Sequence, residues 1–166
     1  MKQRGVTLIQ MLSALAVAVL LAQLGMPAYA RLSDDLHRAA AARDLAQALR
    51  SARSHAMLQG QTVLVQPLDG KWGNGWRVLL EHNQQLLREQ RLSRPLEIAG
   101  NSGGQVKFSA QGVPLGPSNQ FLAATLRVCE RSSGDSRYNV VLASTGRVRL
   151  DTEAAPSTQC PAAAQP

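Results

Sequence analysis

The feature that most limits the fold of this chain is a run of 26 residues without a charged side chain, between Arg4 and Arg31. As an α-helix the run would be about 39 Å long at 1.5 Å per residue, which exceeds the roughly 30 Å hydrocarbon layer of a membrane. Residues 6–24 carry only four polar side chains, those of Thr7, Gln10, Ser13 and Gln23. The run therefore predicts a membrane-spanning helix and argues against a wholly cytosolic protein.

The residues around this run indicate its orientation and leave one alternative open. Lys2 and Arg4 precede it, and the positive-inside rule then holds the N-terminus in the cytoplasm and sends the rest of the chain outward. The alternative is a cleaved secretory signal peptide, because Ala28-Tyr29-Ala30 fits an A-x-A cleavage site. The very short basic leader, and an apolar run that continues into a helical pattern, favour a retained anchor.

A helical pattern follows the apolar run without a break. From Leu32 to Ala56 apolar residues recur at steps of three or four, which predicts an amphipathic helix. We expect it to continue to about Leu58, to stop at Gly60 and to be kinked at Pro27. Arginines interleaved with aspartates along this helix are interpreted as a solvated face: Arg31, Arg38, Arg43, Arg50 and Arg53.

Beyond Gly60 the chain changes to short segments rich in β-forming residues, separated by Gly, Pro, Asn and Ser. Between them, the glycine-rich stretch from Gly70 to Gly75 is interpreted as a turn, with Trp76 in the core. The whole predicts an α+β fold in which one long helix packs on a small antiparallel β domain. The expected strands are residues 62–65, 76–80, 85–88, 96–98, 105–109, 122–129, 138–143 and 147–150.

The N-terminal residues carry a resemblance to a known family. The sequence GVTLIQ at residues 5–10, followed by Pro27-Ala28-Tyr29, resembles the G-F-T-L-I-E motif of type IV prepilins and type II secretion pseudopilins. The resemblance implies a prepilin peptidase that cleaves between Gly5 and Val6 and methylates the new N-terminus at Val6. Val6 stands where phenylalanine is usual, and Gln10 stands where a glutamate normally neutralises the terminal amine of a neighbouring subunit.

Further motifs narrow the resemblance to the FimT/GspH group of minor pilins and pseudopilins. They are LRSARSHA at 49–56, WGNGW at 72–76, VKFS at 106–109 and GRVR at 146–149. The implied fold is a long kinked N-terminal helix on a small antiparallel β domain. The expected division is a leader at residues 1–5, a helix at 6–58 that spans the membrane over about 6–28, a β domain at 59–151 and a tail at 152–166.

The residues that could carry covalent or metal chemistry are few. Cys129 and Cys160 are expected to form one disulfide that tethers the tail, since a metal site needs more ligands. His37, His55 and His82 show no metal-binding spacing, and no catalytic constellation is present. We therefore expect no metal, no cofactor and no enzymatic activity.

The segment from Arg137 to Arg149 holds three arginines and no carboxylate. Alternation along a strand at 147–150 would place Arg147 and Arg149 on one face, about 6–7 Å apart, close to the spacing of phosphates in a DNA strand. The planar guanidinium suits phosphate, and Thr145-Gly146 would form the preceding tight turn and allow a nucleic-acid backbone to approach. In the alternative interpretation, these arginines pair with carboxylates, namely Glu130, Asp151 or Glu153.

The resemblance favours DNA, because the G-R-x-R sequence of FimT-type pilins is associated with DNA capture during natural transformation. Arg137 and Lys107 are expected as accessory contacts. With only 4% aromatic residues, binding should be electrostatic and independent of sequence.

The first hypothesis is thus a minor pilin in the bacterial inner membrane, with a periplasmic domain that becomes extracellular in a type IV pilus. The second is a GspH-like pseudopilin of the type II secretion system. In both, the expected partners are other pilins or pseudopilins, prepilin peptidase and the inner membrane.

Overall fold

The computed structural model describes residues 8–130, 135–153, 155–156 and 160. The chain forms two compact units, Met1–His37 and Arg38–Pro166. The single long helix α1, Leu8–Gln59, contributes to both units and continues through Pro27.

In the first unit, the described residues belong to α1, and their large apolar side chains face outward. Leu12, Leu20 and Met26 are among many that are more than half exposed. Helix α1 is long and apolar enough to span a membrane, and in water such a surface would be costly. The exposed apolar side chains of this unit therefore fit the predicted anchor.

In the second unit, α1 leaves one stripe of residues exposed between Arg38 and Ala56, and its last three residues, 57–59, are exposed as well. Leu45 and Leu49 are completely buried, together with small residues such as Ala42 and Ala52. Because alanine has so little volume, strands can approach the helix axis closely on both flanks of the stripe. Between Arg38 and Ala56, the exposed residues recur with helical periodicity: Ala40, Arg43, Asp44, Gln47, Arg50, Ser51 and Ser54.

The helix ends where the sequence predicts. Gly60 has a φ of 64°, and the amide of Gln61 donates to the carbonyl oxygen of Ala56 at 3.2 Å. This is the capping arrangement that favours glycine directly after a helix.

The first sheet has five strands in the order β3-β2-β1-β5-β6. All of its pairings are antiparallel. The first three strands form a meander along the chain, and the last two extend it on the other side of β1. The strands are β1 Val63–Leu68, β2 Lys71–Leu80, β3 Leu86–Arg91, β5 Val106–Phe108 and β6 Pro114–Leu115.

Apart from Gly70, the glycine-rich stretch lies in strand β2, so the prediction of a turn from Gly70 to Gly75 is correct at Gly70 and wrong for residues 71–75. The turn is Asp69-Gly70, with φ values of 52° and 72°, as in the two-residue hairpin turns that favour Asp-Gly. The later glycines serve packing: a Cβ on Gly73 would lie 1.6 Å from the Leu96 carbonyl oxygen. Trp76 is completely buried, as predicted.

The second sheet has the order β10-β8-β7-β4, and β9 also pairs with β8. The short strand β10 lies in the segment expected to be the tail, and pairs Ala155 with Ser136. The strands are β4 Ile98–Gly100, β7 Ala124–Cys129, β8 Asp135–Leu142, β9 Val148–Asp151 and β10 Ala155–Pro156.

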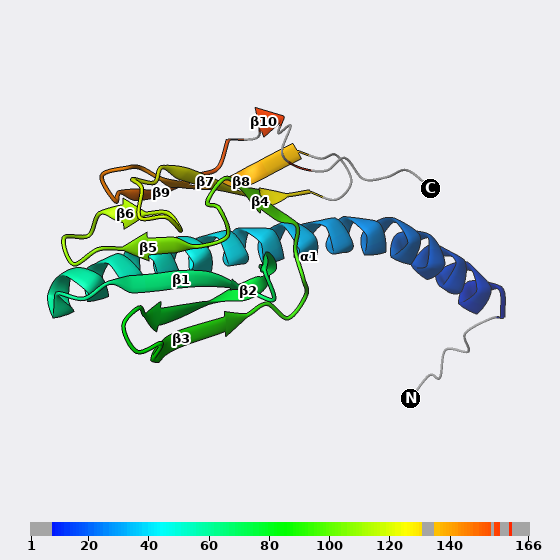
Figure 1. Cartoon of the computed structure of the whole chain (residues 1–166). Coiled ribbons are helices and arrows are strands. Elements are labelled where there is room, and N and C mark those ends of the chain that lie inside the picture. The colour runs from blue at the N-terminus through cyan, green and yellow to red at the C-terminus, as the bar shows by residue number, and fades with distance from the viewer. Residues whose placement is uncertain (1–7, 131–134, 154, 157–159, 161–166) are drawn as a thin grey trace. The chain divides into compact units, whose positions relative to one another are not determined.

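One hydrophobic core joins α1 to both sheets. Its largest completely buried side chains include Trp76 and Phe108 from the first sheet, Leu126 from the second, and Leu45 and Leu49 from α1. Figure 1 shows the strands of both sheets lying along the C-terminal part of α1, which belongs to the second unit. The prediction of a long helix packed on a small antiparallel β domain is confirmed.

Candidate nucleic-acid interface

The hairpin between β8 and β9 presents the two arginines of the GRVR sequence. The amide of Ala143 donates to the Arg147 carbonyl oxygen at 2.9 Å, and that of Gly146 donates to the Ala143 carbonyl oxygen at 2.8 Å. These bonds close a tight turn that ends at Arg147, directly before β9. Gly146 has a φ of 83°, a conformation that favours glycine.

Alternation beyond this turn separates charged from apolar side chains as predicted. Arg147 and Arg149 are exposed, whereas Val148 is 9% exposed and belongs to the core. Leu150 packs against the same core. Because β9 is anchored by Val148 and Leu150, the two guanidinium groups project from a fixed strand.

Two of the three carboxylates that could neutralise these arginines, those of Glu130 and Asp151, have other partners. Glu130 lies 3.5 Å from an Nη atom of Arg38, and Asp151 accepts a hydrogen bond from the amide of Glu153 at 3.1 Å. Within the described part of the chain, neither Arg147 nor Arg149 forms an ion pair or a side-chain hydrogen bond. Their charges are therefore available to a ligand.

Two arginines of α1 hold the hairpin in place by hydrogen bonds to backbone carbonyl oxygens. The sequence-based interpretation of the helix arginines as a solvated face missed this role. Arg53 donates through Nε to the Gly112 carbonyl oxygen at 3.0 Å and through Nη2 to that of Thr145 at 3.2 Å. Arg50 donates through Nε and Nη2 to the Val148 carbonyl oxygen, both at 3.3 Å. Arg53 thus links α1 to a turn of each sheet, and Arg50 binds β9 itself.

Gly146 forms the expected tight turn, and close packing also requires a glycine here. A Cβ there would lie 2.4 Å from the Gly112 carbonyl oxygen and 2.7 Å from Nε of Arg53. Gly146 is buried, so the close neighbours that exclude a side chain belong to the protein. The expectation that this glycine admits a nucleic-acid backbone is wrong.

The two expected accessory cations differ in their surroundings. Arg137 is exposed on β8, in the same sheet as Arg149. Lys107 lies on β5 in the other sheet and is 7% exposed. Its Nζ atom is 2.9 Å from Oε1 of Glu81 and donates to Oδ1 of Asn119 at 2.8 Å. Buried and bonded in this way, Lys107 is not placed to contact DNA, which corrects its assignment as an accessory residue.

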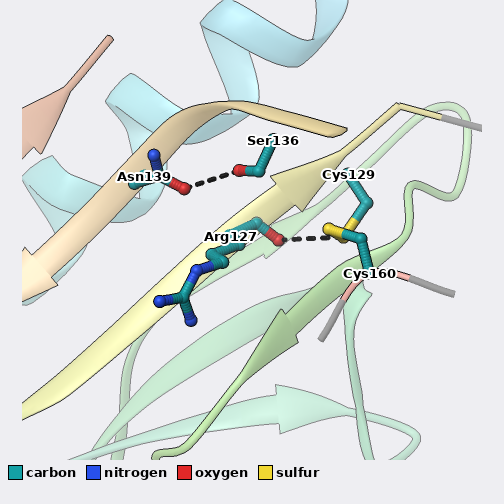
Figure 2. Close-up of a disulfide and its surroundings, with 5 residues drawn as sticks. All are labelled: Arg127, Cys129, Ser136, Asn139 and Cys160. Carbon is teal, nitrogen blue, oxygen red and sulfur yellow. Dashed lines mark hydrogen bonds between the residues drawn. A yellow bond between two sulfur atoms is a disulfide. The ribbon is translucent and has the colours of Figure 1, made fainter. Parts of the chain in front are cut away.

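A disulfide encloses the arginine hairpin. Cys129 at the end of β7 is bonded to Cys160, 31 residues further along the chain, and the interval contains β8, β9 and β10. Figure 2 shows the disulfide beside Arg127 of β7, with Ser136 and Asn139 of β8 close by. The hydroxyl of Ser136 donates to Oδ1 of Asn139 at 2.5 Å. The disulfide predicted from the two cysteines is present.

The remaining predicted sites concern cleavage and metal binding. Gly5 and Val6 lie outside the described residues. Gln10 lies in α1, where the hydroxyl of Ser13 donates to its carbonyl oxygen at 3.0 Å. Among the described residues, no group of three or more His, Cys, Asp or Glu side chains is arranged to hold a metal ion.

Solved structures with a similar fold are type IV minor pilins. A crystal structure of FimU from Pseudomonas aeruginosa, in space group P21, matches with a TM-score of 0.64 and 22% identity. The match covers 78% of this chain and 98% of FimU. A second crystal form of FimU, in space group P65, matches with a TM-score of 0.56 and 21% identity, over 73% of this chain and 98% of FimU. At this identity the likeness establishes the fold alone.

The family is established by the sequence itself. No functionally curated protein matches the chain, but residues 41–146 match the family described as type II transport protein GspH. The matched residues end at Gly146, directly before the two hairpin arginines. Because the match covers more than half of the chain, this protein belongs to the GspH family, and its fold is that of a type IV minor pilin.

Proposed function

We propose that this protein is a minor pilin of a type IV pilus that captures extracellular DNA for natural transformation, independently of sequence. The observation that carries the proposal is the exposed pair Arg147 and Arg149, which has no ion-pair partner among the described residues. Arg137, exposed in the same sheet, is an accessory contact in this proposal.

The chemistry of the pair suits phosphate better than bases. Each guanidinium offers a planar donor fork that can hold a phosphate with two hydrogen bonds. Alternate residues on one face of a strand lie about 6–7 Å apart, so the pair can contact neighbouring phosphates. Aromatic residues make up only 4% of the chain, which leaves little opportunity for base stacking. The resulting affinity would be modest and would fall steeply with salt.

The test is a fluorescence-anisotropy titration of a labelled DNA duplex with the full-length protein in detergent micelles. Arg147→Ala/Arg149→Ala should weaken binding by roughly tenfold to a hundredfold at about 100 mM salt. The matched control is Arg77→Ala/Arg88→Ala, which removes the same charge from two exposed residues of the first sheet. Equal losses in the two variants would mean that net charge, rather than the hairpin, determines binding. Absence of binding by the unaltered protein at low salt would rule out the function.

In the same proposal, α1 anchors the protein in the inner membrane and packs against other pilins. Prepilin peptidase removes residues 1–5 and methylates Val6. The family, the fold and the exposed apolar surface of the first unit support this assignment. Mass spectrometry of the membrane-extracted protein should detect methylated Val6 at the N-terminus, and an intact Met1 would contradict cleavage.

A second candidate function is favoured by the description of the matching family, type II transport protein GspH. In that case the chain is a pseudopilin that takes part in protein secretion. Deletion in the host should then abolish secretion of type II substrates and leave transformation unchanged. A transformation defect that Arg147→Ala/Arg149→Ala reproduces, with normal secretion, would instead favour the pilus.

A further inference from the structure

We infer that the DNA-binding surface extends from the β8–β9 hairpin onto α1, where Arg50 supplies a further phosphate-binding cation. The inference rests on the proposed function, because Arg50 has this role only if Arg147 and Arg149 bind DNA. It adds a residue from a different element, far from the GRVR sequence along the chain.

The position of Arg50 follows from its contact with β9. Its Nε and Nη2 atoms both donate to the carbonyl oxygen of Val148 at 3.3 Å. Val148 is the residue between Arg147 and Arg149, and in a strand its neighbours on either side lie about 6–7 Å apart. The guanidinium of Arg50 is therefore held at the segment of backbone that connects the two exposed arginines.

The contact with Val148 leaves Arg50 able to bind an anion. A guanidinium has five N–H donors, and a single neutral carbonyl oxygen accepts from only two of them. Arg50 is exposed, and no carboxylate of the described residues pairs with it. The positive charges of Arg50, Arg147 and Arg149 thus lie around one strand without a carboxylate partner among the described residues. They repel one another, and a bound anion such as phosphate would relieve this repulsion.

Arg53 differs from Arg50 in this respect and provides a useful contrast. It is half-buried and donates to carbonyl oxygens of two turns, at Gly112 and Thr145. Its bonds hold the turns together, so it acts on DNA binding only through the position of the hairpin. Arg43 provides the surface control, because it is exposed on the same stripe of α1 as Arg50 but about 10 Å further back along the helix.

The experiment measures the dissociation constant for a labelled DNA duplex at several salt concentrations, with the full-length protein in detergent micelles. Each neutralised phosphate contributes about 0.9 to the slope of log K against log salt. Arg50→Ala should weaken binding by about threefold to tenfold and reduce the slope by about 0.9. Arg50→Lys should retain the slope because it retains the charge, and Arg43→Ala should retain both affinity and slope.

Three results would overturn the inference. The first is an unchanged affinity and slope in Arg50→Ala, while Arg147→Ala/Arg149→Ala still weakens binding. The second is a loss of affinity with an unchanged slope, which would show that Arg50 only positions β9. The third is equal behaviour of Arg50→Lys and Arg50→Ala. If Arg147→Ala/Arg149→Ala has no effect, the proposed function fails, and this inference fails with it.

Discussion

The two sheets each carry a prominent cation site, and the sites differ in how the charge is compensated. In the first sheet, Lys107 is buried and its ammonium is bonded to Glu81 and Asn119. In the second, Arg147 and Arg149 are exposed, and the described residues offer them no ion pair. A buried charge must be paired inside the protein, whereas an exposed and unpaired cluster can recruit an anion from outside. Lys107 is therefore a structural cation, whereas Arg147 and Arg149 are candidates for binding a ligand.

The largest effect on stability is expected at the disulfide around the arginine hairpin. Cys129→Ser/Cys160→Ser opens a covalent loop of 31 residues and should lower the free energy of unfolding by about 3–4 kcal/mol in the chain-entropy model. Urea unfolding of the oxidised protein and the variant measures the difference. A change below about 1 kcal/mol would show that strand pairing alone fixes the hairpin.

A smaller loss of stability is expected at the buried cation of the first sheet. Lys107→Met removes the ammonium and leaves Glu81 and Asn119 without their common partner, which should cost about 1–3 kcal/mol. Urea unfolding measures this loss, and DNA affinity should stay within about twofold because one distant charge contributes little. If Lys107→Met weakened DNA binding as much as Arg147→Ala/Arg149→Ala, the distinction between the two cation sites would be wrong.

Local sequence patterns predicted the elements that local chemistry determines. The apolar period after Leu32 and the glycine at position 60 located the helix and its end, because both depend on neighbouring residues. Alternation at 147–150 correctly separated the exposed arginines from Val148. The Asp69-Gly70 turn also had a local signal, which the interpretation of the glycine-rich stretch overlooked.

Contacts between distant residues were not accessible to the same reasoning. Arg53 meets carbonyl oxygens 59 and 92 residues away, and Arg50 meets one 98 residues away. Lys107 alternates with the core residues Val106 and Phe108, so the pattern placed it on the opposite, outward face of the strand. Residues from other segments cover that face, Glu81 and Asn119 among them. Tertiary structure, rather than local periodicity, determines whether these charged side chains are buried and which groups they bind.

The central claim is that Arg147 and Arg149 bind DNA by neutralising phosphates, and the salt dependence of binding tests it most directly. The measurement compares the slope of log K against log salt for the unaltered protein and for Arg147→Ala/Arg149→Ala, with Arg77→Ala/Arg88→Ala as the control. We predict that the hairpin variant reduces the slope by about 1.8, as expected for two phosphate contacts, while the control leaves it unchanged. A hairpin variant with the slope of the unaltered protein would contradict the account.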